Sequence, residues 1–164
     1  MHTAAQIRAE AHASALRVLR SLELPPGTAL AATGSFARNE MTPYSDIDVI
    51  LIYPEGHEPD PALVEQLWYP VWDAKYRLDY ALRTPQECGA IAAEDASAGF
   101  AQLDLAFVAG RKVLVDEARA QLLAAWRRQL QRGFDDFLDT AITRWKRSGA
   151  VAAMTNPDLK NGRG

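Results

Sequence analysis

The sequence has few of the residues that build disulfide frameworks and metal clusters. Its 164 residues include one cysteine, Cys88, and three histidines. A single cysteine excludes an internal disulfide and every zinc site that needs several thiolates. Because so low a cysteine content is typical of proteins that fold in a reducing compartment, we expect a cytoplasmic location.

Long hydrophobic runs are absent as well. No apolar stretch approaches the roughly 18 residues of a membrane-spanning helix, and the first 23 residues lack the apolar block of a secretion signal. Hydrophobic residues still make up 48% of the chain and charged residues 24%, an ordinary balance for a globular protein. We therefore expect one domain with a hydrophobic core and no membrane partner.

The charge is unevenly distributed along the chain. The net charge of -3 comes from 18 basic and 21 acidic residues, and the segment 40–110 alone holds 13 acidic residues and three basic ones. A mildly acidic total does not favour broad contact with nucleic-acid phosphates, so no nucleic-acid partner is expected. We interpret the basic runs at 127–132 and 144–147 as a solvated helix face, with contact to an acidic partner or to nucleotide phosphates as the alternative.

The hydrophobic pattern predicts an α/β fold with a small mixed sheet packed by helices. Alternating or β-branched runs predict strands, and apolar residues at helical spacing predict helices. Thr84, Pro85 and Glu87 together form the start signal of a helix. The expected strands are 28–33, 46–53, 76–83 and 112–115, and the expected helices are 4–23, a short one after Gly34, 62–74, 85–93, 97–107 and 116–147 with a break at Gly133.

Four segments organise the chain in this interpretation. They are an N-terminal helix (1–27), a core (28–115), a C-terminal helical extension (116–148) and an extended tail (149–164). Cys88 is interpreted as a buried packing thiol. The remaining candidates are given structural roles: the histidines His2, His12 and His57 lack metal-ligand spacing, and the tryptophans Trp68, Trp72, Trp126 and Trp145 fall at core-like helical positions.

Two acidic residues stand at the entrance of the expected strand 46–53. Residues i and i+2 of a strand point to the same face, about 6–7 Å apart, so Asp46 and Asp48 are expected to converge. Two ionised carboxylates repel each other unless a cation lies between them. Carboxylate oxygens select Mg²⁺ or Mn²⁺, which complete their coordination with water and substrate phosphates. The pair therefore predicts a divalent metal together with a phosphate substrate.

A glycine–serine turn precedes this acidic pair. Gly34 allows the backbone to approach a ligand closely, and the helix expected after it directs free N–H groups toward that ligand. Ser35 adds a hydroxyl donor. Each feature is weak when taken alone, but a strand, a Gly-Ser turn, a short helix and an acidic strand in this order predict a phosphate-binding site.

The stretch from Thr33 to Asp48 resembles the nucleotidyltransferase signature of the DNA polymerase beta superfamily. More narrowly, it is similar to the N-terminal catalytic domain of the bifunctional uridylyltransferase/uridylyl-removing enzymes, which read Gly-Gly-Tyr-Gly-Arg-Gly-Glu-Leu and then Pro-x-Ser-Asp-(Ile/Val)-Asp. The matching residues are Gly34, Arg38, Glu40, Pro43, Ser45, Asp46 and Asp48, whereas Ser35, Ala37 and Asn39 replace glycines. Further similarity occurs at Leu82-Arg83-Thr84, at Leu103-Asp104 and at 156–160. The last of these segments belongs to a family motif that the chain does not complete, so we expect the chain to be a piece of a longer enzyme.

The resemblance implies a metal site with three carboxylates. Asp46 and Asp48 would bridge two Mg²⁺ or Mn²⁺ ions, and a third carboxylate on a neighbouring strand would share a metal and draw the proton from the attacking hydroxyl. Asp79 is our choice for that residue, because Tyr76-Arg77-Leu78-Asp79 resembles a strand of the related glutamine synthetase adenylyltransferases. Asp104 is the alternative.

The resemblance also implies a substrate and a partner. Gly34, Ser35 and Arg38 would bind the nucleoside triphosphate, and Glu40 would hold either that arginine or the turn in place. For Arg38 and Glu40 the alternative is an exposed position on the short helix. The donor would be UTP, or ATP as in some relatives, and the acceptor a tyrosine hydroxyl of a PII signal-transduction protein. Two alternatives stay open: a small nucleotidyltransferase that acts on an antibiotic or toxin partner, and a non-catalytic nucleotide-binding module with the same fold.

Overall fold

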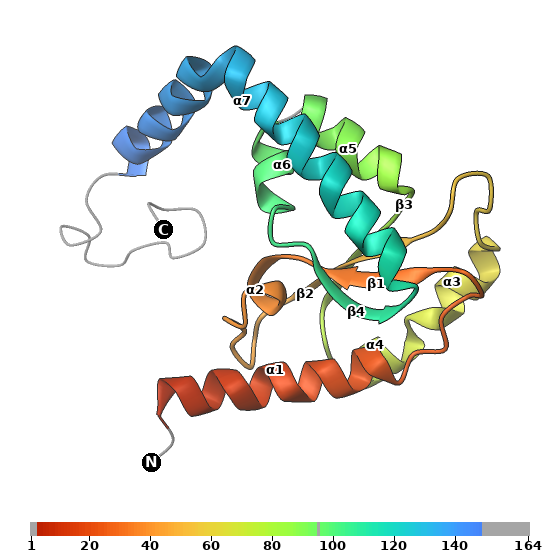
Figure 1. The fold of residues 1–164 in the computed structure, drawn as a ribbon. Coiled ribbons are helices and arrows are strands. Elements are labelled where there is room, and N and C mark those ends of the chain that lie inside the picture. Colours follow the sequence, from red (N-terminus) through yellow and green to blue (C-terminus); the bar gives the residue numbers. More distant parts are fainter. Residues whose placement is uncertain (1–2, 95, 149–164) are drawn as a thin grey trace. The chain divides into compact units, whose positions relative to one another are not determined.

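The computed structural model describes residues 3–94 and 96–148 (Figure 1). The extended tail expected at 149–164 lies outside the described residues. The chain divides into two compact units between Trp126 and Arg127, so the first unit includes the N-terminal helix and runs past the core boundary expected at residue 115. None of the helices in the described ranges is both long and apolar enough to cross a membrane.

A four-stranded mixed sheet forms the centre of the first unit, as the sequence predicts. Its strands are β1 (Ala29–Ala32), β2 (Ile47–Ile52), β3 (Leu78–Arg83) and β4 (Ala106–Gly110), in the order β3-β2-β1-β4. The central β1 is antiparallel to both β2 and β4, and β2 is parallel to β3. The parallel pairing places the starts of β2 and β3 at the same edge of the sheet, where the acidic residues stand.

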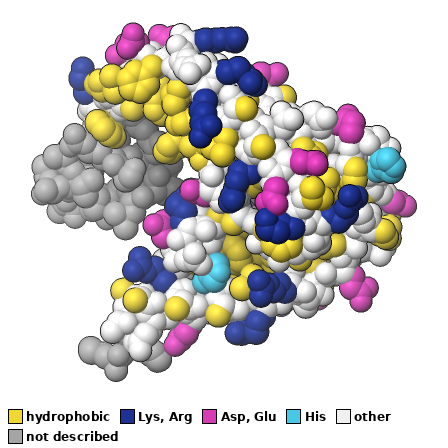
Figure 2. All heavy atoms as spheres, in the orientation of Figure 1, with side chains coloured by type: hydrophobic (Ala, Val, Ile, Leu, Met, Phe, Trp, Pro, Cys, Tyr) yellow, Lys and Arg dark blue, Asp and Glu magenta, His cyan; other side chains and the backbone are white. Residues whose placement is uncertain are grey.

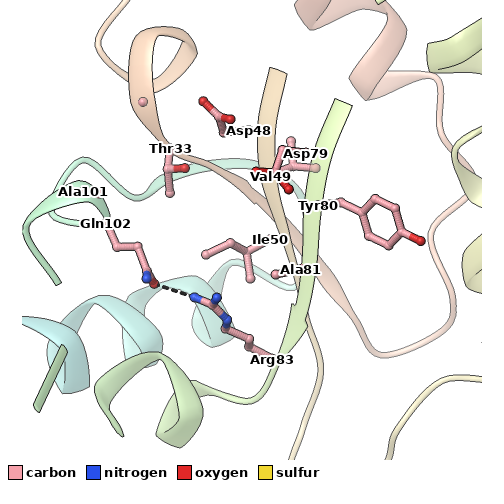
Figure 3. Close-up of a pocket in the computed structure, with 11 residues that line it drawn as sticks. Thr33, Asp48, Val49, Ile50, Asp79, Tyr80, Ala81, Arg83, Ala101 and Gln102 are labelled. Atoms are coloured by element: carbon pink, nitrogen blue, oxygen red, sulfur yellow. Dashed lines mark hydrogen bonds between the residues drawn. The ribbon is translucent and has the colours of Figure 1, made fainter. Parts of the chain in front are cut away.

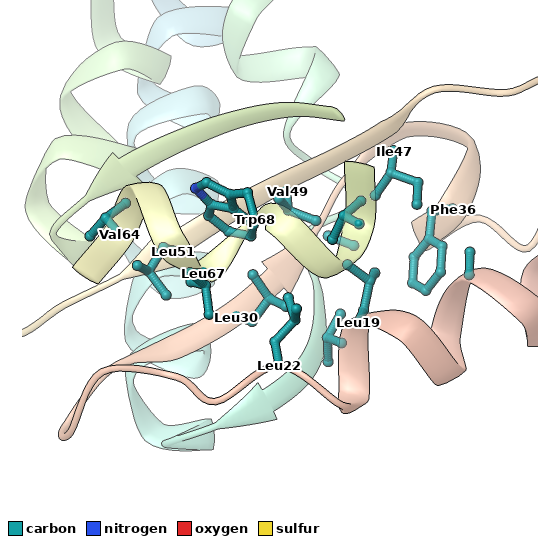
Figure 4. Close-up of a cluster of buried hydrophobic side chains, with 14 of the residues drawn as sticks. Leu19, Leu22, Leu30, Phe36, Ile47, Val49, Leu51, Val64, Leu67 and Trp68 are labelled. Atoms are coloured by element: carbon teal, nitrogen blue, oxygen red, sulfur yellow. The ribbon is translucent and has the colours of Figure 1, made fainter. Parts of the chain in front are cut away.

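Helices cover both faces of this sheet (Figure 1). On one face, the larger core packs against α1 (Ala4–Arg20), α3 (Pro61–Leu67) and α4 (Tyr69–Asp73). Trp68, which joins α3 to α4, is fully buried in this core (Figure 4). The other face packs a smaller core against α5 (Pro85–Glu94) and the start of α7 (Lys112–Ser148).

The alternation of β2 decides which face each of its side chains occupies. Val49 and Leu51 belong to the larger core, whereas Ile50 and Ile52 belong to the core beneath α5 and α7. Because side chains alternate along a strand, Asp48 shares the face of Ile50. At this end of β2 the face is hollowed into a pocket that Asp48 and Ile50 both line.

Two predicted elements are wrong. The segment 112–115 is the first turn of α7 rather than a strand, because Leu114, Val115 and Ala118 are buried together at helical spacing. The fourth strand is instead β4, and the helix expected to reach residue 107 ends with α6 (Ala96–Ala101). Because β4 is a short apolar run, its local pattern does not distinguish it from a buried helix, and only pairing with β1 makes it a strand.

Other local predictions are confirmed. Thr84 and Glu87 cap α5 reciprocally: Thr84 N donates to Glu87 Oε2 at 2.7 Å, and Glu87 N donates to Thr84 Oγ1 at 3.2 Å. Gly133 interrupts α7 with a non-helical backbone (φ -141°, ψ 35°). The tryptophan prediction is right for the buried Trp68 and wrong for Trp72, which is 39% exposed, because the short α4 directs Val71 into the core instead.

The part of α7 that follows Trp126 belongs to the second unit. Arg127, Arg128 and Arg132 are exposed there, which agrees with the solvated face expected from the sequence. Large hydrophobic side chains are exposed on the same segment. Figure 2 shows hydrophobic side chains exposed on one face of the molecule. The core position expected for Trp145 is wrong. These hydrophobic residues are Phe134, Leu138 and Trp145, whose exposed fractions are 56%, 41% and 49%.

Candidate active site

An open pocket of about 340 Å³ extends along β2 and β3 from the edge where both strands begin (Figure 3). Gly34, the first residue of α2 (Gly34–Ala37), lines it together with Asp48 of β2. Asp79 and Arg83 of β3 and Gln102, which follows α6, line it as well, and Thr33 and Tyr80 are its other polar residues. Four segments that lie far apart in the sequence therefore contribute polar groups to one pocket.

Asp48 and Asp79 are cross-strand partners in the parallel β2–β3 ladder. Neighbouring strands lie about 4.8 Å apart, so the two residues stand side by side, and both line the pocket. Two adjacent carboxylates that share a pocket repel each other when both are ionised. A divalent cation removes this repulsion, and Mg²⁺ is commonly held by one or two carboxylates plus substrate phosphates. The chemistry of this donor set thus fits a divalent metal.

Gly34 lies directly against the Asp48 carboxylate. Its φ of 62° is in the left-handed region, and a Cβ atom built on it would lie only 2.6 Å from Asp48 Oδ2. The adjacent Thr33 N donates to the carbonyl oxygen of Asp48 at 3.0 Å, which ties the turn to β2. Only glycine combines this backbone conformation with this close approach, so a ligand that reaches Asp48 also meets the turn.

Ser35 follows in the first turn of α2. Its carbonyl oxygen accepts a hydrogen bond from Glu40 N at 2.8 Å, which closes the turn behind the short helix. The first N–H groups of a helix have no acceptor within the helix. The turn therefore places the start of the short helix beside Asp48, whereas Ser35 itself is not among the residues that line the pocket.

Asp46 is placed differently from the sequence prediction. Its Oδ1 lies 2.6 Å from Arg77 Nε, but out of line for a hydrogen bond, so this buried oxygen has no hydrogen-bond partner. Asp46 does not line the pocket that holds Asp48 and Asp79. In the ranges that the structure describes, no three acidic, histidine or cysteine side chains gather into one metal-binding group. The structure thus brings two of the three expected carboxylates together and pairs Asp46 with arginine.

Arg38 is held between two carboxylates. Its Nε donates to Glu40 Oε2 at 2.8 Å and its Nη1 donates to Asp104 Oδ2 at 2.7 Å. These hydrogen bonds, first Glu40 and then Asp104, raise the pKa of the Arg38 guanidinium. Arg38 and Asp104 contact each other, and neither is among the residues that line the pocket. Of the two candidates for the third carboxylate, only Asp79 is adjacent to Asp48.

Arg83 and Gln102 line the same pocket, although sequence reasoning gave them no part in the site. The alternation of the predicted strand 76–83 was a usable signal, because it places Asp79 and Arg83 on one face. Gln102 gave no such signal, since a helix was expected over that segment. Cys88 is buried as predicted, and burial raises the pKa of its thiol to about 11.

The chain is similar to several known proteins. The family model described as "Nucleotidyltransferase domain" matches residues 14–99. A bifunctional uridylyltransferase/uridylyl-removing enzyme of Corynebacterium glutamicum is 56% identical over all 164 residues, and its counterpart in Mycobacterium tuberculosis is 36% identical over 147 residues, or 84% of the chain. The chain spans 23% and 17% of the lengths of these relatives.

Among solved structures, a toxin–antitoxin crystal structure with AMP-PNP resembles the chain with a TM-score of 0.47 and 12% identity, over 79% of this chain and 97% of that one. This likeness is too remote to bear on the site.

Proposed function

Since the chain belongs to the nucleotidyltransferase domain family, we propose that its pocket transfers a nucleoside monophosphate from a nucleoside triphosphate to an acceptor hydroxyl. The observation that carries this proposal is the in-register pair of Asp48 and Asp79 beside Gly34. An acidic pair that adjoins backbone donors suits a metal-bound triphosphate, because the metal offsets the repulsion between carboxylates and phosphates.

Three acidic residues have roles in this proposed reaction. Asp48 and Asp79 would hold Mg²⁺ or Mn²⁺, and Asp46, whose Oδ1 is buried beside Arg77, is proposed as a further ligand. The bound metal supplies neutralisation of charge on the phosphates. The hydroxyl oxygen forms a bond to the α-phosphorus while the bond from that phosphorus to the bridging oxygen breaks, and pyrophosphate leaves. Asp79, which is exposed, takes the proton of the hydroxyl.

Two other groups are proposed to bind the departing phosphates. The backbone N–H groups of Gly34 and Ser35 and the hydroxyl of Ser35 would donate hydrogen bonds to them. Arg38 adds a positive charge in an orientation fixed by Glu40 and Asp104. Held by two carboxylates, the guanidinium loses little conformational freedom when a phosphate binds.

We propose UTP as the donor and a tyrosine hydroxyl of a PII-type protein as the acceptor. The donor is supported by the names of the relatives, which include uridylyltransferase activity. The acceptor is supported by the family that the motif from Thr33 to Asp48 resembles. Because the chain spans only 23% of the Corynebacterium relative, the activity of the whole relative is a proposal for this chain as well.

Incubation with α-³²P-labelled UTP or ATP, Mg²⁺ and a PII protein tests this function. We expect label from UTP to appear on PII, to require Mg²⁺, and to be removed by mutation of the labelled tyrosine to phenylalanine. Label on PII from ATP alone would contradict the donor, and transfer to other hydroxyl compounds but not to PII would contradict the acceptor. Nucleotide binding without transfer to any acceptor would support the non-catalytic alternative.

A further inference from the structure

The floor of the pocket changes its chemistry along the β2–β3 ladder. Three cross-strand pairs follow one another on the same face: Asp48 with Asp79, Ile50 with Ala81, and Ile52 with Arg83. Successive pairs are about 6.5 Å apart, so Arg83 stands about 13 Å along the ladder from Asp79. An acidic end, an apolar middle and a basic end therefore lie in one line.

Gln102 fixes the side chain of Arg83 at the basic end. Arg83 Nη1 donates to Gln102 Oε1 at 2.9 Å (Figure 3), and Gln102 Nε2 donates to the carbonyl oxygen of Ala98 at 3.3 Å. Both ends of the Gln102 amide are thus engaged, one of them by the backbone of α6. A guanidinium has five N–H donors, so the single hydrogen bond to Gln102 leaves the other donors of Arg83 available to a ligand.

This order of groups matches the order of groups in a nucleotide. The phosphates belong with the metal at the acidic end, because without a metal the two carboxylates would repel them. The flat base then lies over the apolar pair of Ile50 and Ala81, with its edge toward Arg83. Arginine offers donors only, and its fork suits an edge that offers carbonyl oxygens, as guanine and uracil do. Adenine and cytosine place an amino donor on that edge.

We propose that Arg83, held by Gln102, reads the nucleobase and selects a nucleoside triphosphate whose base presents a carbonyl edge. Arg83 is the residue that contacts the base, and Gln102 is a positioning residue that acts through it. The inference rests on the proposed function, since it takes the acidic end of the pocket to bind the phosphates.

Calorimetric titration with each of the four common nucleoside triphosphates and Mg²⁺, without an acceptor, tests the inference. We expect the unmodified chain to bind UTP and GTP about 5- to 150-fold more tightly than ATP and CTP, the range of discrimination of a paired base contact. Arg83→Met should remove this preference while the affinity for ATP and CTP changes little. Arg83→Lys keeps the charge but loses the fork, so it should restore little of the preference.

Variants of the positioning residue supply a readout that a merely structural role would not move. Gln102→Leu, which removes the acceptor for Arg83, should reduce the preference for a carbonyl edge, and Gln102→Glu, which keeps an acceptor, should retain it. Arg20→Gln, an exposed arginine on α1, is the control and should bind as the unmodified chain does. Circular dichroism verifies that each variant is folded.

The outcomes separate this inference from the proposed function. A preference for carbonyl-edge bases that survives in Arg83→Met overturns the inference alone. Equal weakening of all four nucleotides in Arg83→Met, with rescue by Arg83→Lys, shows that Arg83 binds phosphate and also overturns it. If the unmodified chain binds none of the four nucleotides, the proposed function fails and the inference falls with it.

Discussion

Replacing Asp48 by asparagine is expected to reduce nucleotidyl transfer by about 10³-fold or more in kcat/KM. Asparagine keeps the size of the side chain and removes its charge, so the pair of Asp48 and Asp79 loses half of its attraction for a cation. A metal ion contributes several kcal/mol to the stabilisation of transition-state charge, and each 1.36 kcal/mol corresponds to tenfold in rate. The measurement is the initial rate of label transfer from UTP at saturating Mg²⁺.

Asp73→Asn is the matched control for this variant. Asp73 is the exposed last residue of α4 and does not line the pocket, so its substitution removes the same charge without touching the site. We expect its transfer rate to stay within about twofold, because surface substitutions of this kind have small effects. An Asp48→Asn protein as active as Asp73→Asn would show that the acidic pair does not carry the chemistry.

Gly34→Ala is expected to abolish most of the transfer activity and to lower the free energy of unfolding. The new methyl group would lie 2.6 Å from Asp48 Oδ2, so the Asp48 carboxylate must move away from its place beside Asp79. The left-handed backbone adds about 1–2 kcal/mol of strain for a residue with a Cβ atom. Urea denaturation measures the loss of stability, and the label-transfer assay measures the loss of activity.

Gly27→Ala separates strain from the clash. Gly27 also has a positive φ, 82°, but a Cβ atom there meets no atom within 4 Å. This variant should therefore show a loss of stability from strain alone and should keep its activity. If Gly34→Ala and Gly27→Ala retain the same activity, the close approach of the turn to Asp48 has no part in the reaction.

Much of the fold follows from local sequence signals. The reciprocal cap formed by Thr84 and Glu87 and the interruption at Gly133 depend on a few neighbouring residues, and both are present as predicted. The β4 strand does not follow from such signals. Its residues gain strand structure only by pairing with β1, which lies more than 70 residues earlier in the chain.

The candidate site also has a part that local sequence signals predict and a part that depends on long-range strand pairing. The neighbourhood of Gly34 and Asp48 is predictable, because one turn and one strand bring these two residues together. The partnership of Asp48 with Asp79 needs the register of two strands, which the sequence alone does not determine. The ion pair of Asp46 with Arg77 depends on that same register, since Arg77 precedes β3 just as Asp46 precedes β2.

Binding of Mn²⁺ in the presence of UTP tests the central claim most directly, because it measures the acidic pair without any acceptor protein. The electron paramagnetic resonance spectrum of Mn²⁺, compared with that of Mn²⁺ and UTP without protein, gives the amount that the chain binds. The account predicts that the unmodified chain binds Mn²⁺ with UTP and that Asp48→Asn and Asp79→Asn each weaken this binding by tenfold or more, roughly the loss of one charged ligand. Unchanged Mn²⁺ affinity in both variants would contradict the account.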